Sequence, residues 1–437
     1  MREGRRALDC LSYGGGWWGK QSKNRIVNSS SAKPIAPNAA GNSSRPGSLG
    51  EILRVFLKLG LTSFGGPTAH LGYFRAELVA RRGWLTEPAY ADIVALCQFL
   101  PGPASSQVAV SLGMLRAGLA GGLTAWCGFT LPSAMALILF AYGVDRVGDL
   151  NHASWLHGLK IVAMAVVAQA VWAMARALCP DRQRVTLAVG AALLVLALPS
   201  APGQVGAIVA GALAGRLFMP GAPAPVAGGL CFGLSRRLAL MALAMFFALL
   251  FLLPLAGAAS GSHALDLIAS FYRSGALVFG GGHVVLPLLQ QAVVAPGWIG
   301  NDGFLAGYGA AQAVPGPLFT FAAYLGAAMP EAPSGWLGGL ICLTAIYLPS
   351  FLLLIGVLPF WDALRRQAGV QSALKGVNAA VVGLLLAALY TPVWTSGITS
   401  SADFAIGLAA FLLLVFWRAP PWLVVVLGAA AAWATGA

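Results

Sequence analysis

The chain has 437 residues, of which 58% are hydrophobic and 9% are charged, and its formal net charge is +13. Its mean hydropathy is +0.78. A soluble domain of this length carries far more charge, so the composition excludes a soluble protein and predicts an all-α polytopic membrane protein. The six cysteines are scattered without a CxxC pair, which argues against disulfide or metal chemistry.

Residues 1–50 are polar, basic and rich in Ser, Asn, Pro and Gly. This composition predicts a disordered leader, and the absence of an apolar stretch within it excludes a secretory signal. A basic tail before the first membrane span predicts a cytoplasmic N-terminus. Nucleic-acid binding is the alternative for a basic tail, but the segment lacks a basic-aromatic pattern.

Two parts of the remaining chain repeat each other. The sequence FGG at 64–66 returns at 279–281, and PGP at 101–103 returns at 315–317 with a glutamine three residues ahead in both cases. We therefore expect two homologous repeats, residues 51–218 and 269–437. The linker between them, residues 219–268, contains one further apolar run at 238–256 that predicts a connecting transmembrane helix.

Each repeat divides in the same way, into two interrupted segments and four apolar runs. The interrupted segments are 51–80 and 88–115 in the first repeat and 268–294 and 302–329 in the second. The apolar runs are 117–143, 155–179, 184–199 and 202–218, and then 336–361, 374–392, 403–417 and 421–435. If the interrupted segments are re-entrant hairpins, the arginine distribution places the two repeats in inverted orientations.

The interruptions predict an anion site. Proline tolerates the first position of a helix, so Pro103 is expected to start a half-helix whose first N–H groups have no intrahelical acceptor. Such N–H groups and the helix dipole favour anions. Pro67, after the glycine bend at 65–66, predicts the same arrangement. Four helix N-termini that converge near the membrane midplane suit a compact tetrahedral dianion.

Dipoles alone are weak, so at least one full positive charge is expected beside the anion, from Arg75, Lys160 or Lys375. The candidate substrate-binding residues are Phe64, Gly65, Gly66, Pro67, Thr68, His70, Arg75, Gln98, Pro101, Gly102, Pro103, Ser105, Ser106, Gln107 and Lys160 in the first repeat and Phe279, Gly280, Gly281, Gly282, His283, Gln312, Pro315, Gly316, Pro317, Thr320, Lys375 and Asn378 in the second.

Structural alternatives exist for these residues. Prolines kink packed helices, glycines allow helices to approach closely, and lysines extend to the membrane interface. His70 and His283 are either capping residues or proton carriers. Asp92 is a second candidate proton carrier or a plain interface residue.

Inverted repeats with interrupted helices are typical of secondary transporters. The chain has no nucleotide-binding motif, so an ion gradient or exchange would supply the energy. A passive oxyanion channel is a close alternative. A membrane enzyme is a remote one, because the acidic residues and histidines are dispersed. No cofactor is expected. Protons as the coupling ion and a homodimeric state stay open.

The sequences FGGPTAHLGYFRAELVARRGWL, QFLPGPASSQVAVSLG, FGGGHVVLPLL and PGPLFTFAAYLGAAM strongly resemble the chromate ion transporter family in its long, two-domain form. The resemblance covers residues 51–437. It implies a bacterial inner-membrane protein that exports chromate and confers chromate resistance, with sulfate as a related, competing or exchanged oxyanion.

Overall fold

The computed structural model describes residues 47–147, 154–221 and 232–435. These residues form helices joined by short connections and contain no strand, as an all-α membrane protein requires. Five of the described helical segments are long and apolar enough to cross a membrane: 104–144, 155–178, 236–260, 335–364 and 368–397. The predicted disordered leader lies almost wholly outside the described residues.

The first repeat begins with two interrupted segments. The first segment contains α1 (Leu49–Thr62), α2 (Gly66–Phe74) and the π-helix η1 (Arg75–Arg81), and the second contains α3 (Glu87–Phe99) and the start of α4 (Ala104–Val147). Ala117 and Gly118 have non-helical backbone angles, so α4 is two helices in sequence. Three helices then complete the repeat: α5 (Ser154–Leu178), α6 (Arg182–Ala197) and α7 (Ala201–Phe218).

The connecting helix predicted from the sequence is α8 (Arg236–Ser260). The interrupted segments of the second repeat are α9 (His263–Ala276), η3 (Gly282–Val284) and α10 (Val285–Val293), followed by α11 (Asn301–Ala313), η4 (Leu318–Thr320) and α12 (Phe321–Ala327). The remaining helices are α13 (Gly335–Val357), η5 (Leu358–Phe360), α14 (Trp361–Leu364), α15 (Ala368–Ala388), η6 (Leu389–Trp394), α16 (Thr395–Gly397), α17 (Ser401–Val415) and α18 (Pro421–Thr435).

All four predicted interruptions are confirmed. Gly65 and Gly66 have φ angles of 99° and 78°, and Gly280 and Gly281 have φ angles of 74° and 147°. The central glycines of the two PGP sequences, Gly102 and Gly316, have φ angles of 118° and 100°. Residues with a Cβ rarely adopt this region, so glycine at each position lets the chain turn between two half-helices.

Two details differ from the sequence prediction. The half-helix after the first PGP starts at Ala104, so Pro103 precedes it and its carbonyl accepts the Gln107 N–H at 2.9 Å. In the second repeat the half-helices open with tight 3₁₀ turns. The Thr320 N–H there donates to the Pro317 carbonyl at 3.1 Å and is not free for a ligand. A 3₁₀ turn closes one residue earlier than an α-turn, which explains the difference.

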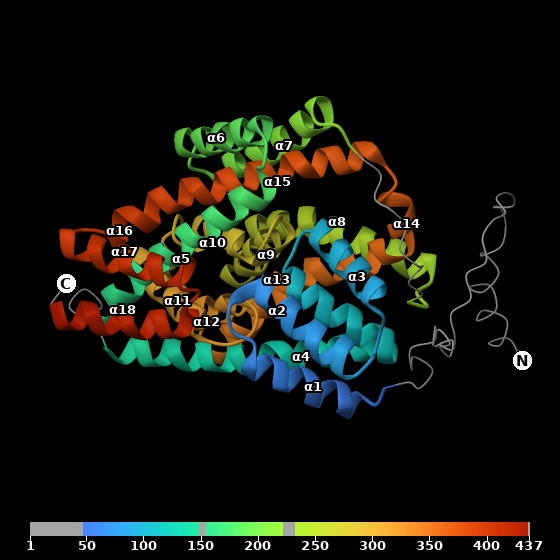
Figure 1. Ribbon diagram of the computed structural model, residues 1–437, viewed down its shortest axis with the longest axis horizontal. Helices are drawn as coiled ribbons and strands as arrows, with labels where there is room; N and C mark the ends of the chain where they lie inside the picture. The colour runs from blue at the N-terminus through green and yellow to red at the C-terminus, as the bar shows by residue number, and fades with distance from the viewer. Residues whose placement is uncertain (1–46, 148–153, 222–231, 436–437) are drawn as a thin grey trace, which may run out of the picture.

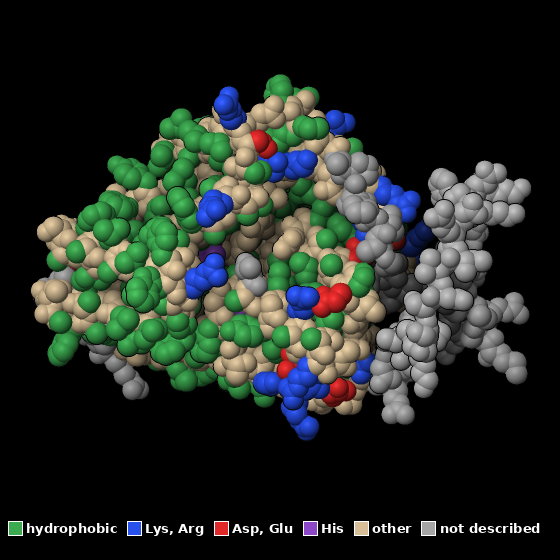
Figure 2. All heavy atoms as spheres, viewed as in Figure 1, with side chains coloured by type: hydrophobic (Ala, Val, Ile, Leu, Met, Phe, Trp, Pro, Cys, Tyr) green, Lys and Arg blue, Asp and Glu red, His purple; other side chains and the backbone are tan. Residues whose placement is uncertain are grey.

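Helix α15 runs along the molecule from α14 to α16, with α6 and α7 on its outer side (Figure 1). Helices α1, α4 and α18 lie along the opposite side, and the interrupted helices α9–α12 lie between these layers. Small residues allow close packing, as where Gly215 of α7 meets Gly376 of α15. Figure 2 shows apolar side chains over the α16–α18 end of this face and charged groups mainly toward the opposite end.

Candidate functional site at the junction of the interrupted helices

The two repeats are joined at their interruptions by a matched pair of backbone hydrogen bonds. The Gly102 N–H donates to the Val278 carbonyl at 2.7 Å, and the Gly316 N–H donates to the Ser63 carbonyl at 2.9 Å. Val278 and Ser63 are the residues immediately before the two FGG sequences. Each PGP loop is therefore bonded to the FGG loop of the other repeat, which brings four interruptions into one junction.

The two FGG loops also face each other across this junction. A Cβ at Gly66 would lie 3.8 Å from Nε2 of His283, and a Cβ at Gly282 would lie 3.3 Å from Pro67. Asn378 of α15 adjoins the second loop, with its Oδ1 3.5 Å from a Cβ at Gly280. The Phe64 ring lies 6.5 Å from that of Trp422 in α18, and Phe279 packs on the main apolar core.

The half-helix after the first PGP presents donors inside the protein. Ser105 and Ser106 are 2% and 0% exposed. No acceptor among the described residues takes the N–H groups of Ala104, Ser105 or Ser106. The Ser106 hydroxyl lies 3.4 Å from the Tyr347 hydroxyl of α13, again across the two repeats. Buried N–H donors at a helix N-terminus are a chemistry that suits an anion.

Two serines at the junction were missed by sequence reasoning, although the repeated Pro-Ser pairs at 132–133 and 349–350 were the signal. Ser133 donates to the Pro315 carbonyl and lies against Gly316. Ser350 lies equivalently against Gly102, is fully buried, and its hydroxyl has no partner among the described residues. These serines follow prolines within transmembrane helices, so each helix presents a hydroxyl to the opposite PGP loop.

The amide side chains occupy different positions. Gln107 is buried, and its Nε2 donates to the Pro101 carbonyl at 2.8 Å. Gln98 is exposed, whereas its equivalent Gln312 is half-buried beside Tyr308. The Thr320 hydroxyl donates to the Pro317 carbonyl at 2.7 Å, which stabilises the turn itself.

The two histidines also differ. Nδ1 of His283 lies 3.0 Å from the Tyr308 hydroxyl of α11. His70 is 1% exposed and packs edge-on against Phe129, with ring centroids 5.3 Å apart. Each histidine follows its glycine bend within four residues.

The three cations predicted to assist the anion are engaged elsewhere. Arg75 pairs with Glu87 at 2.9 Å in an exposed ion pair. Lys160 pairs with Asp302 at 3.0 Å, and Lys375 donates to the Pro220 carbonyl at 2.7 Å. In this conformation the junction consists of neutral donors and the two histidines. The helices that carry these cations were predicted correctly, but the directions of long side chains are set by partners far away in the sequence.

Asp92 forms a second connection between the repeats. Its carboxylate accepts from the Arg365 guanidinium and from the Trp361 indole at 3.3 Å. Arg365 also pairs with Asp362. The Asp92 and Arg365 side chains are 4% and 2% exposed, so this is a buried ion pair. Sequence reasoning assigned Asp92 as a proton carrier or interface residue, and no feature of the sequence identified Arg365 as its partner.

A polar cavity of about 1050 Å³ lies at the end of the molecule where α11 begins. Its lining includes Tyr142, Trp298, Asn301, Asp302 and Tyr324. Tyr142 belongs to the first repeat and the other four residues to the second, so residues of both repeats line this cavity. Among the described residues, no cluster of His, Cys, Asp and Glu that could hold a metal ion is present.

The architecture and the junction define a polytopic membrane protein built from two halves that meet at interrupted helices. The family model for chromate transporters matches residues 50–216 and again residues 265–433. The chain therefore belongs to the chromate transporter family, whose members are transporters and not enzymes.

Several relatives agree with this assignment. The chain is 27% identical to a chromate transport protein of Pseudomonas aeruginosa over 343 residues, 78% of this chain and 80% of the relative. It is 23% identical to a chromate transport protein of Cupriavidus metallidurans over 367 residues, 78% of this chain and 82% of that protein. The uncharacterized transporter YwrB of Bacillus subtilis is 35% identical over 125 residues, 28% of this chain and 61% of that protein. No solved structure matches the chain.

Proposed function

We propose that the protein is a secondary active transporter that moves tetrahedral oxyanions, chromate foremost, out of the cell across the bacterial inner membrane by alternating access. The substrate binds at the junction of the four interruptions. The observation that carries this proposal is the matched pair of hydrogen bonds from Gly102 to Val278 and from Gly316 to Ser63. These bonds support a mechanism in which the two repeats move against each other about the junction while the four interruptions stay together.

The donors at the junction favour a compact oxyanion over a bulky or cationic substrate. Backbone N–H groups at the start of α4 and the hydroxyls of Ser105 and Ser350 are all available to acceptor oxygens. No Lys or Arg side chain is bonded to the described residues of these loops. A fully desolvated dianion requires more than dipoles, and protonation of His283 or His70 during the cycle would supply charge. Such protonation would couple transport to protons.

Two ion pairs between the repeats support an inverted arrangement with a gate at each end. Asp92 of α3 pairs with Arg365 just before α15, whereas Asp302 of the equivalent helix α11 pairs with Lys160, which adjoins Gly397 just beyond η6. Equivalent helices therefore begin at opposite ends of α15, with the N-terminus assigned to the cytoplasmic side by its basic charge. Each ion pair links one repeat to the other. Opening of either end would therefore require the ion pair at that end to break.

The close alternative is a passive oxyanion channel, with sulfate or another oxyanion as its ion. A carrier has to rearrange for each ion, so unlabelled substrate on the far side accelerates movement of the labelled ion. A channel shows no such acceleration and passes ions down their gradient without a coupled ion. These behaviours are separable in one preparation.

We would measure uptake of radiolabelled chromate and sulfate into everted vesicles, with and without an imposed proton gradient and with unlabelled chromate inside. We expect gradient-dependent chromate uptake that internal chromate accelerates and that sulfate inhibits. Gln98→Ala and Gln312→Ala, inserted at wild-type levels, should each reduce uptake. Uptake that depends on neither the proton gradient nor the internal anion would show that the protein is a channel. Wild-type uptake in both variants would show that the two glutamines are not part of the site.

A further inference from the structure

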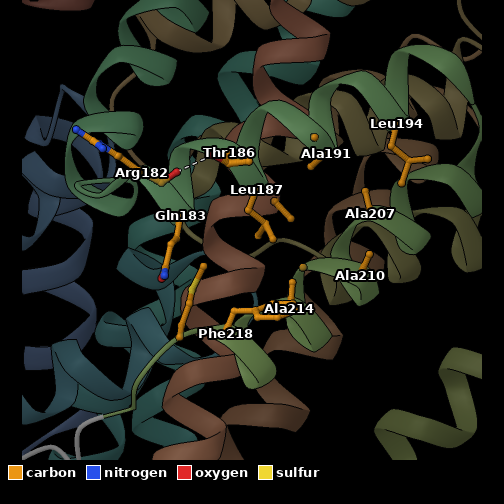
Figure 3. Close-up of a pocket in the computed structure, with 14 residues that line it drawn as sticks. Arg182, Gln183, Thr186, Leu187, Ala191, Leu194, Ala207, Ala210, Ala214 and Phe218 are labelled. Carbon is orange, nitrogen blue, oxygen red and sulfur yellow. Dashed lines mark hydrogen bonds between the residues drawn. The ribbon is translucent and has the colours of Figure 1, made fainter.

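A long apolar groove lies on the surface of the molecule between α6, α7 and α15, away from the junction. Its volume is about 660 Å³, and Figure 3 shows residues that line it on both helices of the α6–α7 pair. The lining is mostly small or aliphatic, including Gly190, Ala191, Ala207 and Gly211. The adjoining faces of α6 and α7 are apolar and exposed, with Leu193 and Leu213 at 63% and 59%. Exposed apolar faces of this kind mark a surface that contacts lipid or another protein.

We propose that this groove binds one anionic phospholipid, with an acyl chain along the groove and the headgroup phosphate at Arg182. The length of the groove favours a lipid. Its lining extends along α6 from Arg182 to Leu194, which at about 1.5 Å of rise per residue is about 18 Å. The hydrocarbon core is about 30 Å thick, so the groove spans roughly one leaflet.

A helix of a second copy is the alternative occupant of an apolar groove between helices. The positive charge at one end of the groove favours an anionic lipid over such a helix.

The charge at one end of the groove is positive. Arg182 and Gln183 line this end, and the lining contains no Asp or Glu. The nearby Asp181 carboxylate is held by Arg184 at 2.7 Å, whereas the Arg182 guanidinium forms no ion pair among the described residues. Lys375 lies at the same end, bonded to the Pro220 carbonyl next to the lining residue Met219. A basic group between helices at the membrane interface is the chemistry that recognises a lipid phosphate.

The test is native mass spectrometry of the purified full chain with added phosphatidylglycerol or phosphatidylcholine of identical acyl chains. We expect wild-type protein to retain one phosphatidylglycerol in preference to phosphatidylcholine. Arg182→Gln should lower that preference about fivefold, the factor expected for one basic residue at a lipid surface. Arg176→Gln is the matched control, because Arg176 lies over the Trp172 ring and does not line the groove.

A second variant tests the tail. A Cβ at Gly190 has no neighbour within 4 Å, so Gly190→Leu should fill the groove without disturbing the fold and abolish retention of both lipids. Equal retention of the two lipids by wild-type protein would overturn the proposal. So would a dimer in detergent that Gly190→Leu dissociates while lipid retention stays unchanged, because the groove would then be an interface between copies. None of these readouts depends on chromate transport.

Discussion

The two repeats form equivalent backbone hydrogen bonds at the junction but differ in the side-chain hydrogen bonds around it. Ser133 of the first repeat donates to the Pro315 carbonyl, whereas the equivalent Ser350 is buried and unbonded within the described residues. His283 meets Tyr308, whereas His70 packs against an aromatic ring. Equivalent backbone bonds with unequal side-chain bonds are expected for a two-state transporter in one of its states. Under the proposed alternating access, the backbone junction would be the fixed part, and the side chains would report which state is occupied.

The largest effect is expected from substitutions at the PGP glycines, which both repeats share. In Gly102→Ala or Gly316→Ala the new Cβ would overlap Ser350 or Ser133, and the φ angles of 118° and 100° are unfavourable for alanine. We expect each variant to lose about 3 kcal/mol or more of stability and nearly all chromate uptake. Thermal unfolding in detergent and vesicle uptake measure the two effects.

Each repeat supplies its own control for these substitutions. Gly83 and Gly297 are equivalent positions with φ angles of 59° and 79°, and a Cβ there has no neighbour within 4 Å. Gly83→Ala and Gly297→Ala should cost only about 1 kcal/mol, from the backbone alone, and keep uptake. If Gly102→Ala and Gly316→Ala behaved like these controls, the junction would not be tightly packed.

The next largest effect is a difference in stability between variants of the two ion pairs that join the repeats. Removal of one partner from a buried pair costs about 3–5 kcal/mol, and Asp362 remains to hold Arg365, so Asp92→Asn should cost about 3 kcal/mol. The Asp302 side chain is 41% exposed, so Asp302→Asn should cost at most about 1 kcal/mol. Thermal unfolding of the two variants gives the difference directly.

Replacing both partners distinguishes a gate from a purely structural ion pair. Asp92→Leu with Arg365→Met removes both charges and should recover much of the stability lost in Asp92→Asn. If the pair is a gate, the double variant should still open more easily at that end of the molecule. A cysteine introduced near the junction should then react faster with a thiol reagent added from that side. Wild-type labelling in the stable double variant would make the pair structural only.

A smaller effect distinguishes the two junction serines. Ser133→Ala removes a bonded hydroxyl and should cost about 0.5–1.5 kcal/mol. Ser350→Ala removes a hydroxyl that has no partner among the described residues, so its stability should be nearly unchanged while chromate uptake falls. Unfolding and uptake, measured on both variants, test this reversal. Equal stability losses would show that the two serines are bonded alike, and unchanged uptake in Ser350→Ala would remove it from the site.

The repeats, the interruptions and the positions of most helices could be predicted because they depend on local sequence. Glycine with positive φ, proline before a half-helix and long apolar runs each leave a mark within a few residues. Ser350 and Ser133 were recoverable in the same way, because the Pro-Ser pairs repeat. The meeting of the four loops at one junction was predictable from the repeat itself, since equivalent loops of paired repeats lie near one pseudo-two-fold axis.

The pairing of long charged side chains could not be predicted. Arg365 and Asp92 are far apart in the sequence, and nothing near either residue indicates the other. Lys160 and Lys375 occupy equivalent positions, yet one pairs with Asp302 and the other with the Pro220 carbonyl. Lysine side chains reach several ångströms in many directions, so their contacts depend on tertiary partners and not on the repeat pattern.

The smallest expected effect is a pH dependence that belongs to the first repeat alone. Glu77 lies in η1, outside the candidate membrane spans, and the aligned part of the second repeat has only uncharged Gln291 and Ala292. Burial opposes ionisation of this carboxyl, but hydrogen bonds from Arg82, Lys58 and Arg81 outweigh it and lower the pKa of Glu77 to about 2.

Because the folded pKa of Glu77 lies below the ordinary value, its ionised form stabilises the fold at any pH above about 4.5, and this contribution disappears as the pH falls toward 2. Glu77→Gln should lower the unfolding temperature at pH 7. The decline of the unfolding temperature between about pH 4.5 and pH 2 should be shallower in this variant than in wild type. Gln291→Ala, at the aligned position of the second repeat, should leave the decline as in wild type. An unchanged decline in Glu77→Gln would mean that other carboxyls dominate acid unfolding and that Glu77 does not make the first repeat acid-sensitive.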